Sequence, residues 1–130
     1  MTEEINHLNL TLEECFILGR YIADGHTRKD FRKQKGRENE RYYQLVLSIG
    51  ESKETEFALS IKDNNYNLFT HSKSVKRFVF SKKRLVEIAE EHCGVCAINK
   101  KISPTLLDLP KEHLSKLLDG YRIVTGKQIS

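Results

Sequence analysis

The sequence predicts an α+β fold whose elements follow the order αββαββα, with one further helix after them. Three observations predict it: an apolar pattern with helical spacing near the N-terminus, strict alternation over residues 42–49, and a second pair of strand-like segments between helical ones. The 130 residues are enough for a core, so we expect residues 1–130 to form a single domain.

The first predicted helix begins after Thr11. Thr11 and Glu14 stand three residues apart, which is the signature of a capping box. Apolar and small residues then recur with helical spacing at Leu12, Phe16, Gly19 and Ala23. The pattern ends at Asp24, and we expect Gly25 to close the helix in the left-handed conformation.

Two hairpins are predicted next. A polar, basic segment (residues 26–41) precedes the alternating strand, in which one face carries Tyr43, Leu45, Leu47 and Ile49. Ser52 is predicted to cap a helix that runs to about Lys62. Residues 66–80 then form the second hairpin, with its turn at residues 72–74.

The remaining segments are predicted to be helical. Ser81 is expected to cap a helix over residues 82–93, which Gly94 ends. Ser103 and Pro104 mark the start of a short helix, and Pro110 opens the last one.

Cys93 and Cys96 form a single CxxC pair next to the end of the predicted helix. Zinc would need two more ligands, and His92 is the only obvious neighbour. We therefore interpret the pair as part of a helix end.

Asp24 is the most informative residue of the chain. An ionised carboxylate is disfavoured at a helix C-terminus, where the dipole and the free carbonyls are already negative. A divalent cation bound to Asp24 would remove the conflict, so the sequence predicts a metal site there. An ordinary Asp-Gly turn after a helix is the alternative.

A weaker copy of the first segment occurs near the C-terminus. Residues 117–126 repeat the pattern of residues 16–25, and Gly120 and Gly126 correspond to Gly19 and Gly25. Thr125 stands where the first copy has its acid. A neutral hydroxyl is a poor substitute for a carboxylate as a ligand for a hard cation.

With both copies in view, the chain resembles the LAGLIDADG homing endonucleases, especially the dodecapeptide type found in inteins. The resemblance rests on the motifs at residues 16–25 and 117–126 and on the segment 99–110 between them. It implies a curved four-stranded antiparallel sheet in the major groove of double-stranded DNA. It also implies that the motif helices pack together through Gly19, Ala23 and Gly120.

The resemblance further implies metal-dependent hydrolysis of DNA phosphodiester bonds. Asp24 would hold Mg²⁺, and Lys100 matches the family's active-site lysine by position. Because Thr125 replaces the second acid, a catalytically inactive DNA- or RNA-binding module, similar to a maturase, or an endonuclease remnant is the alternative. We expect one lobe plus the helix that begins a second, and a homodimer through the motif helices would bring two Asp24 residues together.

Basic residues gather in two runs, although the net charge is only +4. Residues 28–41 hold seven basic residues against three acids, and residues 73–84 hold six and no acid. Such runs on hairpins are typical of phosphate contact. The predicted DNA contacts are Arg28, Lys29, Arg32, Lys33, Lys76 and Arg77, with Tyr42 and Gln44 as base readers.

The sequence also bears on localisation. No apolar stretch approaches the length of a membrane span, and the N-terminus lacks signal-peptide character. Together with the three cysteines, which suggest a reducing compartment, this predicts a cytoplasmic or nucleoid-associated protein.

Overall fold

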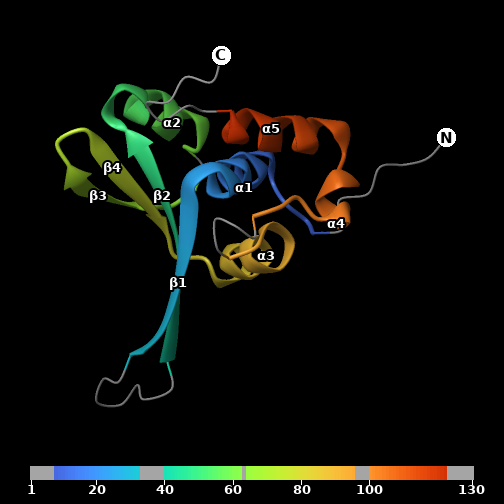
Figure 1. The fold of residues 1–130 in the computed structure, drawn as a ribbon, viewed down its shortest axis with the longest axis horizontal. Helices are drawn as coiled ribbons and strands as arrows, with labels where there is room; N and C mark the ends of the chain where they lie inside the picture. The colour runs from blue at the N-terminus through green and yellow to red at the C-terminus, as the bar shows by residue number, and fades with distance from the viewer. Residues whose placement is uncertain (1–7, 33–39, 63, 96–99, 123–130) are drawn as a thin grey trace.

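The computed structural model describes residues 8–32, 40–62, 64–95 and 100–122 (Figure 1). It contains one four-stranded antiparallel sheet with the strand order β1-β2-β4-β3. The strands are β1 (Gly25–Arg32), β2 (Glu40–Gly50), β3 (Asn67–Ser72) and β4 (Val75–Phe80). The helices are α1 (Leu12–Asp24), η1 (Glu51–Lys53), α2 (Glu54–Ser60), α3 (Lys83–Cys93), α4 (Pro104–Leu107) and α5 (Lys111–Tyr121). The predicted α+β class and the αββαββα order are confirmed.

The start of α1 is the predicted capping box. The Thr11 hydroxyl accepts a hydrogen bond from the Glu14 amide at 3.0 Å, and the Glu14 carboxylate accepts one from the Thr11 amide at 2.9 Å. Glu14 is buried and also pairs with Lys82 and Arg84, each at 3.3 Å. This carboxylate therefore ties the start of α1 to the start of α3.

Two predicted caps are wrong. Ser52 lies inside the short 3-10 helix η1, so α2 starts two residues later, after Lys53, and no side chain caps it. Helix α3 starts at Lys83, and its N-cap Lys82 makes no side-chain cap bond, so Ser81 is not the cap. Gly94 ends α3 with a φ of 86°, and the Ser103 hydroxyl caps α4, as predicted.

The two faces of the sheet differ. One face, which we call the core face, carries the buried side chains of Leu45, Leu47, Phe78 and Phe80. Helices α1, α2 and α3 lie on this side: Phe57 of α2 packs edge-on against Phe78, and the Thr27 hydroxyl donates to Glu90 of α3. Because neighbouring residues of a strand point to opposite faces, the alternate positions form a second face, the outer face.

The β1–β2 hairpin extends past the rest of the sheet (Figure 1). Residues 45–50 of β2 pair with β4, whereas residues 40–47 pair with β1. The far part of this hairpin is therefore a two-stranded ribbon. In the described residues, no helix is long and apolar enough to cross a membrane.

Candidate nucleic-acid interface

The two glycine motifs meet at the crossing of α1 and α5. A Cβ atom added at Gly19 would lie 1.8 Å from the Leu117 carbonyl oxygen, and one added at Gly120 would lie 2.0 Å from the Phe16 carbonyl oxygen. Only glycine lets the two backbones approach this closely. Ala23 lies further along α1 and is exposed.

This crossing forms within one chain. Helix α5 covers the glycine face of α1, so a second copy could use that face only by displacing α5. The expected homodimer through the motif helices therefore gains no support from the structure.

Gly25 does not adopt the predicted left-handed conformation. Its φ is −116° and its ψ is 170°, which is extended backbone, and β1 begins there. The need for glycine is steric instead. An added Cβ would lie 2.7 Å from the Tyr21 Cα atom and 2.9 Å from Leu47 Cδ2. Gly25 thus lets the chain turn directly from α1 into the sheet.

Asp24 lies at the end of α1 with its side chain 59% exposed. The guanidinium of Arg20, one turn earlier, lies 3.6 Å from the Asp24 carboxylate, and the Arg20 side chain is only 2% exposed. Burial lowers the pKa of Arg20, and the charge of Asp24 opposes that shift. The guanidinium of Arg20 thus lies beside the carboxylate where the sequence predicted a bound metal cation.

Lys100 reaches the same helix end. Its ammonium donates to the carbonyl oxygens of Tyr21 at 2.7 Å and Gly25 at 2.8 Å, and it lies 4.1 Å from the centroid of the Tyr21 ring. Cations are stabilising at a helix C-terminus, where carbonyl groups lack helical partners. The Tyr21 hydroxyl in turn donates to the Gly94 carbonyl at 2.6 Å. Lys100 therefore caps α1 in this structure.

The described residues alone do not fit a Mg²⁺ site. Asp24 lines a surface pocket with Glu51, but the other residues that line this pocket carry no charge: Ser48, Gly50, Ser52, Ser74 and Val75. In the part of the chain that the structure describes, no group of three or more His, Cys, Asp or Glu side chains could hold a metal ion. One exposed carboxylate beside a guanidinium is a poor cage for a hard cation.

Only one cysteine of the CxxC pair lies among the described residues. Cys93 is buried, and burial raises the pKa of its thiol to about 12, which disfavours the thiolate that zinc requires. Cys96 lies outside the described residues. The interpretation of Cys93 and Gly94 as a helix end agrees with the structure.

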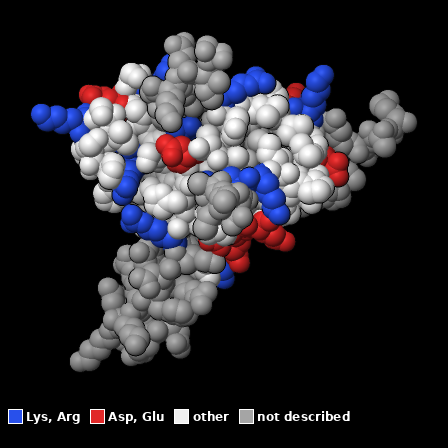
Figure 2. Space-filling view, in the orientation of Figure 1, with Lys and Arg blue, Asp and Glu red and all other residues white. Residues whose placement is uncertain are grey.

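The strand register gathers several predicted contacts on the outer face. Arg28 pairs with Gln44, and Arg77 pairs with Ser48 on one side and with Phe69 on the other. Since paired residues of antiparallel strands share a face, these five side chains lie on the same side of the sheet. Figure 2 shows Lys and Arg side chains on the sheet side of the molecule, at the left of the view.

The register separates two predicted contacts. Lys76 precedes Arg77 in β4 and therefore lies on the core face, where its ammonium donates to the Thr70 hydroxyl at 3.0 Å. A ligand bound to the outer face could therefore contact Arg77 but not Lys76. Lys29, Arg32 and Tyr42 belong to the β1–β2 ladder by backbone register, but their side chains are not among those described. Lys33 and Thr125 lie outside the described residues altogether.

His26 reports the electrostatic character of the outer face. It pairs with Val46 in the register and so lies on the same side as Arg28 and Arg77. Burial lowers its pKa first, and the positive charges of Arg28, Arg77 and Lys100 lower it further, against the opposing effect of Asp24. Burial is the larger cause, and among the charges around His26 the three cations outnumber the one acid.

Two residues of this region escaped the sequence reasoning. Arg20 stands four residues before Asp24 in an otherwise apolar helix, and that spacing is the signal for an ion pair on one helix face. Phe69 is exposed on the outer face, and the alternation of residues 67–72 could have placed it there.

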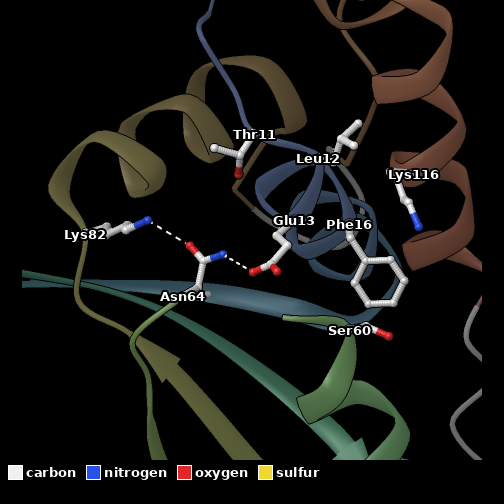
Figure 3. Close-up of a pocket in the computed structure, with 8 residues that line it drawn as sticks. All are labelled: Thr11, Leu12, Glu13, Phe16, Ser60, Asn64, Lys82 and Lys116. Atoms are coloured by element: carbon white, nitrogen blue, oxygen red, sulfur yellow. Dashed lines mark hydrogen bonds between the residues drawn. The ribbon is translucent and has the colours of Figure 1, made fainter. Parts of the chain in front are cut away.

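A second pocket lies at the opposite end of α1 (Figure 3). Its polar groups bind one another: the Asn64 amide donates to Glu13 at 2.6 Å, and the Lys82 ammonium donates to the Asn64 oxygen at 2.8 Å. These bonds connect α1, the segment before β3 and the start of α3. We interpret this pocket as structural, because its polar groups join neighbouring elements of the fold.

No protein-family model matches the chain, and no curated protein matches it. Among solved structures, one similar chain is the LAGLIDADG meganuclease I-AabMI, in a crystal structure bound to uncleaved DNA. The two chains share 14% sequence identity at a TM-score of 0.42, over 64% of this chain and 30% of the other. This chain thus spans less than a third of that meganuclease chain. The fold assignment follows from the αββαββα topology of the chain itself.

Proposed function

We propose that this chain binds double-stranded DNA through the outer face of its sheet. The observation that carries the proposal is the register, which brings Arg28, Gln44 and Arg77 to one side of the sheet. Arginine recognises phosphate and guanine through the same planar set of donors, and glutamine can bond bidentately to adenine. This face therefore combines groups that bind the backbone with groups that read bases.

The shape of the sheet favours duplex DNA as the ligand. The major groove of B-DNA is about 12 Å wide and admits a two-stranded β-ribbon, which is what the far part of the β1–β2 hairpin offers. A-form RNA has a deep and narrow major groove that side chains cannot read. RNA binding is thus the weaker alternative, and a competition experiment with duplex RNA distinguishes the two.

Fluorescence anisotropy with a labelled random-sequence duplex tests the proposal. The double variant Arg28→Ala/Arg77→Ala should weaken binding at least tenfold and reduce the slope of log K against log salt by about one for each phosphate that is no longer neutralised. Lys76→Ala is the matched control, because this lysine neighbours Arg77 and lies on the other face. Equal weakening in the control and the double variant would contradict the outer-face assignment.

Metal-dependent cleavage of the bound DNA is the second candidate function. The observation that favours it is the exposed Asp24 carboxylate at the end of a glycine-packed helix. Asp24 would hold the Mg²⁺ that such hydrolysis requires, and the further ligands of the ion would have to come from outside the described residues or from the DNA. The role of Lys100 in this chemistry also stays a prediction.

A nicking assay on supercoiled plasmid tests cleavage directly. If Asp24 holds the metal, nicking requires Mg²⁺ and is lost in Asp24→Asn, while anisotropy shows unchanged DNA binding. Nicking that survives Asp24→Asn would rule out this carboxylate as the ligand. Binding without any nicking would favour the inactive DNA-binding module.

A further inference from the structure

Phe69 is an exposed aromatic residue on the face that we propose for DNA. All six residues of β3 are exposed, and the Phe69 side chain is 55% exposed. A single exposed apolar residue is ordinary on a protein surface and needs no explanation by itself. The position of Phe69 opposite Arg77 in the strand register is what makes it informative.

One hydrogen-bond donor of Arg77 has no acceptor within the described chain. Its Nε atom is buried and finds no hydrogen-bond partner among the described residues. A buried donor without a partner is costly, and a ligand or ordered water commonly supplies the missing acceptor. Because this atom has no exposed surface in the unbound chain, a phosphate or base oxygen of a duplex would accept from it only after the Arg77 side chain changes its rotamer.

Arg77 and Phe69 therefore offer complementary chemistry side by side. Opposite residues of antiparallel strands have their Cβ atoms about 5 Å apart, so both side chains can reach the same stretch of a groove. In the major groove, guanine presents two acceptors that suit arginine. Thymine presents an apolar 5-methyl group that suits phenylalanine.

We propose that Phe69 is a specificity-determining residue that reads the 5-methyl group of a thymine, beside the DNA contact made by Arg77. The inference rests on the proposed binding of duplex DNA by the outer face. It adds a residue and a base preference that the charge pattern does not supply. A thymine methyl placed against the exposed ring buries apolar surface on both partners, and uracil offers no such group.

The experiment begins with selection of tight-binding duplexes from a random pool by the wild-type chain. Each thymine of a selected duplex is then replaced by deoxyuridine, which removes only the 5-methyl group. We expect one or two positions at which uracil weakens wild-type binding by about fourfold, the effect of burying one methyl-sized group. Phe69→Ala should bind the thymine and uracil duplexes equally at those positions.

Leu68→Ala is the matched control, since Leu68 is the exposed neighbour of Phe69 in β3 and lies on the core face. It should retain the full thymine preference. Circular dichroism of each variant checks that the fold is kept, and Phe69→Leu, which keeps an apolar group, should retain part of the preference.

The outcomes separate the two proposals. A chain that fails to bind the random-sequence duplex in the anisotropy experiment would overturn the proposed function, and this inference with it. A chain that binds the random duplex but enriches no sequence would overturn the role of Phe69 alone. Enriched duplexes whose binding is insensitive to uracil at every position would overturn the role of Phe69 alone. So would a thymine preference that persists unchanged in Phe69→Ala.

Discussion

The two ends of α1 both carry acidic residues, but they use them differently. At the N-terminal end, Glu14 is buried and accepts bonds from the Thr11 amide and from Lys82 and Arg84. At the C-terminal end, Asp24 is mostly exposed and has Arg20 at 3.6 Å. A carboxylate whose lone pairs are filled by the fold contributes to stability, whereas one left open to solvent is available to a ligand.

The basic residues at the two ends of α1 also bind different groups. Lys82 and Arg84 bind the Glu14 carboxylate at the first end. At the second end Lys100 binds the backbone carbonyls of Tyr21 and Gly25, and Asp24 stays exposed. The charged groups at the start of α1 therefore bind one another and hold α1 to α3, whereas the Asp24 carboxylate at the end of the helix remains exposed.

The largest effect is expected from a change between the two ends, where α1 meets α5. Gly19→Ala places a methyl group against the Leu117 carbonyl, so the helices must separate. We expect a decrease of about 3 kcal/mol or more in the free energy of unfolding, measured by urea denaturation. Gly50→Ala is the control, because nothing lies within 4 Å of its added Cβ, and it should change stability by less than about 0.5 kcal/mol. Equal effects would contradict the close crossing.

The N-terminal end should respond next. Glu14→Ala removes half of the capping box and the partner of two cations. We expect a decrease of about 2 kcal/mol in the free energy of unfolding. Glu91→Ala on the exposed side of α3 is the control and should stay within about 0.5 kcal/mol of the wild type. A negligible effect of Glu14→Ala would mean that the contacts of Glu14 do not stabilise the fold.

The C-terminal end should respond less. Lys100→Met keeps the length of the side chain but removes the ammonium that bonds to Tyr21 and Gly25, and we expect a decrease of about 1–2 kcal/mol in the free energy of unfolding. Lys101→Met is the matched control at the adjacent exposed lysine. A Lys100→Met variant with unchanged stability but without nicking activity would favour the catalytic role implied by the family resemblance.

Much of the fold could be predicted from the sequence because its signals are local. The capping box and the alternation in β2 depend on spacing within one segment, and Gly19 and Gly120 are matched because the same short motif occurs twice in the sequence. The partners of Lys100 could not be predicted, since Tyr21 lies 79 residues away and only the fold brings them together. The two-residue period of a strand places Lys76 and Arg77 on opposite faces. Taken as one basic run, residues 73–84 predicted both as DNA contacts.

The smallest effect, and the one that distinguishes the two ends most cleanly, is on the pH dependence of stability. The pKa of Glu14 is lowered because the Thr11 amide, Lys82 and Arg84 together outweigh burial, which would raise it. The unfolded chain therefore binds the proton more readily, and stability is lost as the pH falls below about 4.5. The pKa of His26 is lowered by burial and by Arg28, Arg77 and Lys100.

For His26 the unfolded chain again binds more protons, so stability already begins to fall as the pH drops below about 6.5. His26→Gln should flatten the curve of unfolding free energy just below about pH 6.5, and Glu14→Gln should flatten it only below about pH 4.5. Bound DNA should raise the pKa of His26, because phosphate near the ring favours its protonated form. In the complex, the loss of stability below about pH 6.5 should therefore be smaller than in the free chain. A His26→Gln variant that keeps the wild-type slope in both conditions would contradict the lowered pKa of His26.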